Sequence, residues 1–204
     1  CTFTAHAQGN TSQTTVMKNS KKVLVVFFSR TGENYAVGNI EKGNTHIIAE
    51  MIAKETEGKL FRIETVNPYP DEYKACVEVA KAEKESNARP EIKGDVKVED
   101  YDVIFLGYPN WWGDMPMAVY TFIEKHNWNG KTVVPFCTSG TSSAEASYRL
   151  VRSLCPQSTV LEGIQIRRGT YDTAYERVIA WLQEIGIVEL NNGCLLYTSP
   201  SPRD

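Results

Sequence analysis

The sequence predicts an α/β fold: a doubly wound, five-stranded parallel sheet in the order 2-1-3-4-5, with helices on both faces. One observation is the continuous apolar run Val23–Phe28, because a strand that is apolar on both faces is typical of the centre of a parallel sheet. Another is that four more short apolar segments follow, separated by turns and by stretches with helical spacing. Right-handed crossovers then make this strand order the natural topology.

The elements that follow the first strand alternate between extended and helical patterns. Glu33–Gly43 contains two glycines and has no clean period, so it predicts a loop. Asn44-Thr45 then opens a helix over His46–Thr56, and either residue is a good N-cap. Lys59–Thr65 is the expected second strand.

The middle of the chain begins with Val66–Pro70, whose two prolines exclude a helix and a central strand. Asp71–Ala88 predicts a charged amphipathic helix, with Asp71 and Glu72 in its first turn. One face of this predicted helix, Asp71–Ala88, carries Tyr73, Cys76, Val77 and Ala80. Arg89–Glu99, which follows it, is expected to be an extended connection.

Three strands and three helices are predicted in the remainder of the chain. The strands are Tyr101–Gly107, Thr132–Cys137 and Val160–Ile166, and the helices are Met117–His126, Ala144–Leu154 and Asp172–Ile185. In the last helix, four side chains should point inward: Ala174, Val178, Trp181 and Leu182.

Length and composition suit one domain, expected over residues 22–190. The chain has 204 residues, 42% of them hydrophobic, and a net charge of −3, which gives no basic footprint for nucleic acid. No apolar run approaches the roughly 20 residues that span a bilayer, so no membrane span is expected. The five cysteines and three histidines show no metal-ligand spacing, so neither a metal site nor a disulfide framework is indicated.

The two ends do not fit the alternating pattern. Residues 1–21 are polar, and Ala5-His6-Ala7 fits a signal-peptide cleavage site, which would make the protein exported or periplasmic. In the alternative, Met17 is the start and the protein is cytoplasmic. Residues 191–204 are expected to be a disordered, non-native tail, since Cys194–Asp204 resembles a translated sequencing adaptor.

Ser29, Arg30, Thr31 and Gly32 follow the first strand, at the edge where open α/β sheets bind ligands. Hydroxyls and free N–H groups can bind phosphate oxygens, and glycine lets the chain come close to a ligand. The helix that begins near Asn44-Thr45 adds partial positive charge. The segment predicts an anion cradle, although a plain polar turn would have a similar composition.

Pro109, Asn110, Trp111, Trp112 and Gly113 form the loop after the third strand. Two adjacent tryptophans in a loop suggest an aromatic plate for a flat heterocycle. The alternative is a loop folded back on the core. Asn110 offers an amide for a ring edge, and Gly113 permits a close backbone approach.

Small residues follow the fourth strand, as they do in many strand-to-helix loops. They can donate backbone N–H groups to ring carbonyls, and they are Cys137, Thr138, Ser139 and Gly140. Cys137 is expected to be a core residue rather than a nucleophile, because no Cys–His pairing is visible in the sequence. No catalytic residue is predicted.

Residues 21–185 resemble the flavodoxin family, most specifically in the segments SRTGENYAVGNIEKGNT and LGYPNWWGDMPMAV. The resemblance implies FMN as cofactor, with its ring between Pro109–Gly113 and Cys137–Gly140. It implies a phosphate site made of Ser29, Arg30, Thr31, Gly32, Asn44 and Thr45. The Glu33–Gly43 insertion departs from the usual phosphate loop, and its role is left open.

The resemblance favours a monomeric electron-transfer protein that exchanges electrons with a reductase donor and an acceptor protein. Bound flavin would perform the redox chemistry, and nothing in the sequence marks a nicotinamide pocket. One alternative is an FMN-dependent NAD(P)H:quinone or nitro-reductase, which shares the fold. The other is a flavin-free module that keeps the fold alone.

Overall fold

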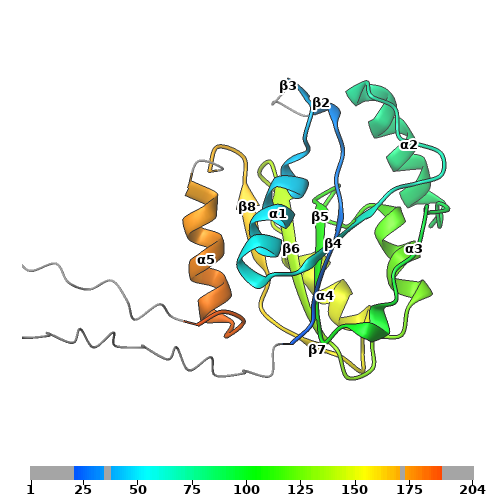
Figure 1. Cartoon of the computed structure of the whole chain (residues 1–204). Helices are drawn as coiled ribbons and strands as arrows, with labels where there is room; N and C mark the ends of the chain where they lie inside the picture. The colour runs from blue at the N-terminus through cyan, green and yellow to red at the C-terminus, as the bar shows by residue number, and fades with distance from the viewer. Residues whose placement is uncertain (1–20, 35–37, 171–172, 190–204) are drawn as a thin grey trace, which may run out of the picture.

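A parallel sheet with helices on both faces forms the body of the protein (Figure 1). The computed structural model describes residues 21–34, 38–170 and 173–189. All of the predicted leader except Lys21, and the whole of the predicted tail 191–204, lie outside these residues. The strands of the sheet are β1 (Val23–Phe28), β4 (Lys59–Ile63), β5 (Val103–Pro109), β6 (Thr132–Ser139), β7 (Thr159–Val160) and β8 (Ile164–Arg167).

The strand order is β4-β1-β5-β6-β7, with β8 also paired to β6, and every pairing is parallel. This confirms the predicted order 2-1-3-4-5. The predicted fifth strand is divided into β7 and β8, which pair with the two ends of β6. Pro135 lies in β6 between the two paired segments and has no N–H to donate.

The described residues form five α-helices, four of which pack on the two faces of the sheet. Helices α1 and α5 pack on one face, around Phe27, Ile48 and Trp181, while α3 and α4 pack on the other (Figure 1). The helices are α1 (Asn44–Thr56), α2 (Tyr73–Glu85), α3 (Met117–Lys125), α4 (Glu145–Leu154) and α5 (Ala174–Glu184). The four residues predicted to face inward from α5 are buried. No helix in the described part of the chain is long and apolar enough to cross a membrane.

The predicted loop Glu33–Gly43 contains structure that its composition did not reveal. Strands β2 (Gly32–Asn34) and β3 (Gly38–Ile40) pair there as a short antiparallel sheet. Such a pair is held by backbone hydrogen bonds and needs no alternating apolar pattern, which explains why the sequence did not predict it.

Several predicted helix boundaries also need correction. Helix α2 begins at Tyr73, so Asp71 and Glu72 precede its first turn, and it ends before the predicted Ala88. The N-cap of α1 is Gly43, with no side-chain cap. A short 3₁₀ helix, η1 (Val98–Asp100), interrupts the predicted extended connection.

Candidate functional site

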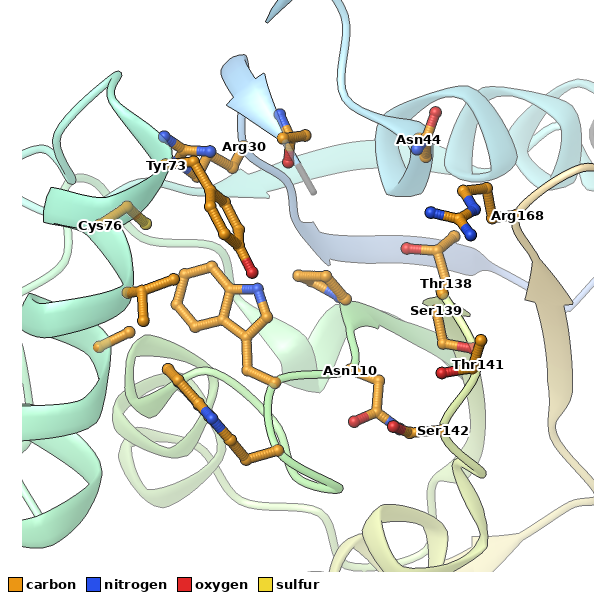
Figure 2. A pocket seen from close by; sticks show the side chains of 17 residues that line it. Arg30, Asn44, Tyr73, Cys76, Asn110, Thr138, Ser139, Thr141, Ser142 and Arg168 are labelled. Carbon is orange, nitrogen blue, oxygen red and sulfur yellow. The ribbon is translucent and has the colours of Figure 1, made fainter. Parts of the chain in front are cut away.

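A pocket of about 320 Å³ opens at the carboxyl edge of the sheet, at the lower end of the range of about 300–1,000 Å³ typical of ligand sites. It lies beyond the ends of β1, β5, β6 and β8, where the strand order reverses and ligands bind in open α/β sheets. Figure 2 shows Tyr73 and Cys76 on one side and Thr138, Ser139, Thr141, Ser142 and Arg168 on the opposite side. The pocket therefore has one wall from helix α2 and one from the polar loops after β6 and β8.

The start of helix α1 lies against the loop that follows β1. The backbone N–H of His46 donates to the hydroxyl of Ser29 at 3.2 Å. A Cβ on Gly43 would lie 2.1 Å from that hydroxyl, so only glycine lets the two segments approach this closely. The N–H groups of Asn44 and Thr45 donate to no acceptor within the described residues. Free N–H groups at a helix N-terminus form a site for an anion.

Arg30 joins the β2–β3 pair to the segment before α2. Its guanidinium donates to the carbonyls of Pro70 at 2.7 Å and Asp71 at 2.6 Å, and also to the carbonyl of Glu33. The Nε of Arg30 is buried and has no partner in the described part of the chain. The Glu33 carboxylate accepts from the N–H of Tyr73, which ties the pair to the start of α2.

The tryptophan loop presents its two indoles differently. Trp111 packs edge-to-face on Phe28 and Tyr69, with ring centroids 5.5 Å and 5.4 Å away. Trp112 is 50% exposed and has a φ of 52°, which is strained for a bulky residue. Both line the pocket. The alternative of a loop folded back on the core holds in part for Trp111, which packs against the core, but not for Trp112.

The other residues of this loop fix its shape. The Asn110 side chain donates to the carbonyl of Ser143 at 2.9 Å and accepts from the N–H of Gly113 at 2.7 Å. It therefore joins two loops, although it also borders the pocket. Gly113 has a φ of 74° and open space where a Cβ would be, so it serves the backbone turn rather than a close approach.

Gln165 of β8 organises the polar wall. Its amide donates to the hydroxyl of Ser139 and the carbonyl of Ser142, both at 2.6 Å, and accepts from the N–H of Ala144 at 3.2 Å. Cys137 is buried beneath this wall, and burial raises the pKa of its thiol far above the ordinary value. A thiol that stays protonated is a poor nucleophile, which agrees with the core role expected for Cys137.

Of the fifteen predicted site residues, nine line the pocket and six do not. Those that line it are Arg30, Asn44, Pro109, Asn110, Trp111, Trp112, Thr138, Ser139 and Gly140. Those that do not are Ser29, Thr31, Gly32, Thr45, Gly113 and Cys137. Of the latter, Ser29 and Thr45 are buried in the contacts that hold the start of α1.

Sequence reasoning missed the contributions of α2 and of the loop after β8. Tyr73, Cys76, Val77 and Ala80 line the pocket, although their spacing predicted only a common face of the helix. Arg168 follows β8 and also lines it. The rule that places ligands at the carboxyl ends of strands could have identified Arg168.

The pocket lining carries little acid–base chemistry. None of the described lining residues is an aspartate, glutamate or histidine. Burial raises the pKa of the Cys76 thiol above its ordinary value, so it stays protonated near neutral pH. Nor does any group of three His, Cys, Asp or Glu side chains in the described residues offer a metal site. The arrangement is suited to holding a flat, anionic ligand rather than to transferring protons to it.

Comparisons with known proteins agree with this geometry. The family model described as Flavodoxin matches residues 22–185. No curated protein sequence matches the chain.

A crystal structure described as that of a flavoprotein from Bacteroides eggerthii DSM 20697 is 33% identical. The match covers 83% of this chain and 99% of that one, with a TM-score of 0.67. A second one, from Bacteroides uniformis ATCC 8492, is 26% identical, covers 78% and 99% of the two chains, and has a TM-score of 0.62.

A flavoprotein from Lactobacillus acidophilus NCFM in complex with FMN shares the fold at 20% identity and a TM-score of 0.58. That match covers 71% of this chain and 93% of the other. The family match over most of the chain and the similarity to the B. eggerthii structure confirm the resemblance seen in the sequence. The family match supports FMN as the cofactor. The chain belongs to the flavodoxin family.

Proposed function

We propose that the protein binds one FMN in the pocket and carries electrons between a reductase donor and an acceptor protein. The observation that carries the proposal is the pocket itself, which pairs an aromatic and apolar wall with a polar wall and an uncapped helix N-terminus. FMN has matching parts: a flat ring system and a terminal phosphate.

The described residues offer hydrogen-bond donors that fit such a ligand. The N–H groups of Asn44 and Thr45, which have no acceptor within the described residues, are donors at the start of α1, and Figure 2 shows Arg30 across the pocket from Asn44, beside Tyr73. Gly43 packs so closely on Ser29 that these donors are held in place without a ligand. Thr31, expected to contact the phosphate, does not line the pocket, and that role stays a prediction.

Each wall has a distinct task in this proposal. Trp111 and Trp112 offer aromatic surface to the ring, and the rigid edge-to-face contacts of Trp111 hold its indole in one orientation. The loop Thr138–Ser142, fixed by Gln165, presents polar groups to the opposite side. When bound, FMN would supply the redox chemistry, because its ring accepts and releases electrons.

A carrier is favoured over an enzyme with its own substrate because the described lining offers no general acid or base that titrates near neutral pH. The redox partners would therefore exchange electrons with the ring at the pocket mouth. The exposed Trp112 borders that mouth.

The test uses the purified full chain. Adding it to FMN should quench the flavin fluorescence with a stoichiometry of one. The loaded protein should be reduced by dithionite, but it should consume NADPH only slowly unless a flavodoxin reductase is added. Rapid NADPH oxidation with turnover of a quinone by the protein alone would support the reductase alternative. No quenching at all would refute FMN binding.

A further inference from the structure

Arg168 borders the pocket from a part of the chain that the flavodoxin-like motifs do not include. It follows β8, and its backbone N–H donates to the carbonyl of Ser139 at 2.9 Å. Figure 2 shows its side chain near Asn44 and Thr138, at the end of the pocket where α1 begins. The loop after β8 thus places Arg168 at the polar end of the pocket.

Two contacts connect this arginine to the start of α1. The buried hydroxyls of Thr45 and Thr138 are hydrogen-bonded at 2.7 Å, which ties the first turn of α1 to the end of β6. Ser139, the next residue in β6, accepts from Arg168. Asn44 and Arg168 therefore stand on the same rim, positioned by adjacent residues of one strand.

The other arginine of the pocket has a different task. Both terminal nitrogens of the Arg30 guanidinium donate to backbone carbonyls, those of Glu33, Pro70 and Asp71. These bonds hold the β2–β3 pair against the segment before α2. The geometry makes Arg30 a positioning residue for the insertion.

We propose that Arg168 supplies the cationic charge that selects a phosphorylated flavin, while Arg30 fixes the shape of the pocket. The inference rests on the proposed function, because it assumes that the pocket binds FMN. A phosphate monoester carries a charge of about −1.5 to −2 at pH 7. None of the described residues that line the pocket is an aspartate or a glutamate, so Arg168 brings positive charge to a lining without acidic side chains.

The prediction concerns ligand choice rather than electron transfer. R168Q should weaken FMN binding about ten- to a hundredfold, as expected for loss of a charge-assisted hydrogen bond. Riboflavin lacks the phosphate, so its affinity should change less than about threefold. The salt dependence of FMN binding should also become weaker, since it reports the charge pairing.

The chain offers a matched control one residue away. Arg167, the last residue of β8, is exposed and does not line the pocket, so R167Q removes the same charge at the neighbouring position and should leave both affinities unchanged. R168K should retain most of the preference for FMN because it keeps the charge. R30Q should weaken both ligands together, because it releases the β2–β3 pair.

The experiment titrates the full chain and its variants against FMN and riboflavin by fluorescence quenching, at low and high salt. Circular dichroism and a urea midpoint check that each variant is folded, and R168M replaces R168Q if the latter does not fold. Unchanged FMN affinity in a folded Arg168 variant, or equal losses for both flavins, would overturn the assignment. If the unmodified chain binds neither flavin, the proposed function fails first and the role of Arg168 fails with it.

Discussion

The Thr45–Thr138 hydrogen bond is the most direct test of how the site is assembled. Its two hydroxyls lie 2.7 Å apart, and Thr45 and Thr138 are only 2% and 4% exposed. Each can be replaced by valine, which is similar in size but has no hydroxyl. The prediction is that the two single replacements cost different amounts of stability.

The difference follows from what each replacement leaves behind. T138V leaves the Thr45 hydroxyl away from the pocket surface and without a partner, which should cost about 2–3 kcal/mol. T45V leaves the hydroxyl of Thr138, which borders the pocket and can turn to water, so about 1 kcal/mol is expected. The double variant leaves neither hydroxyl without a partner, so it should be more stable than T138V alone.

The measurement is urea unfolding of the flavin-free protein, so that ligand binding does not add to stability. In a separate thermal melt of the same flavin-free protein, T138V should lower the melting temperature by about 4–12 °C, at about 2–4 °C per kcal/mol for a domain of this size. T159V is the control: Thr159 is exposed, and its replacement should change stability by less than about 0.5 kcal/mol.

Additive effects in the double variant would refute the reasoning, because they would mean that the two hydroxyls do not depend on each other. Equal losses from T45V and T138V would refute the asymmetry, and with it the conclusion that only Thr138 can reach water at the pocket.

Three further predictions address the site and the core. G43A places a Cβ 2.1 Å from the Ser29 hydroxyl, so it should push the start of α1 away from the loop after β1. FMN affinity should then fall at least tenfold, with a smaller loss for riboflavin, because the free N–H groups at the start of α1 would move. An unchanged ratio of the two affinities would contradict this. W111A should cost about 3 kcal/mol in urea unfolding because its ring packs on the core, whereas W112A should cost less than about 0.5 kcal/mol and affect FMN titrations only; equal costs would contradict the two roles. Burial lowers the pKa of His126, so below its unfolded value of about 6.5 the unfolded chain binds the proton first and stability falls with falling pH. H126Q should flatten that slope, by at most about 1.4 kcal/mol per pH unit, in urea midpoints measured between pH 7 and 5; an unchanged slope would place the effect elsewhere, for example on His46, whose pKa burial also lowers.

Much of the fold could be predicted because the signal is local. Apolar runs such as Val23–Phe28 mark strands that are buried on both faces, and their order in the chain restricts the topology. The tryptophan loop and the loop after β6 were placed at the pocket for the same reason, since residues that follow parallel strands share one edge of the sheet.

The separate roles of the individual site residues could be assigned only from the tertiary structure. Ser29 and Arg30 are neighbours in the sequence, yet the Ser29 hydroxyl accepts from the N–H of His46 in the first turn of α1, while the Arg30 guanidinium holds the β2–β3 pair. These roles depend on partners many residues away, at His46 and at Pro70–Asp71, which no local pattern encodes.

The sequence by itself therefore determined the fold class, the edge of the sheet that carries the site and the family, because periodicity and motifs are properties of short segments. Only the tertiary structure showed that α2 forms one wall of the pocket, that Gln165 fixes the other and that Arg168 joins the rim. Side-chain contacts between distant segments are set by packing and hydrogen-bond geometry in three dimensions, and the spacing of residues along the chain does not contain them.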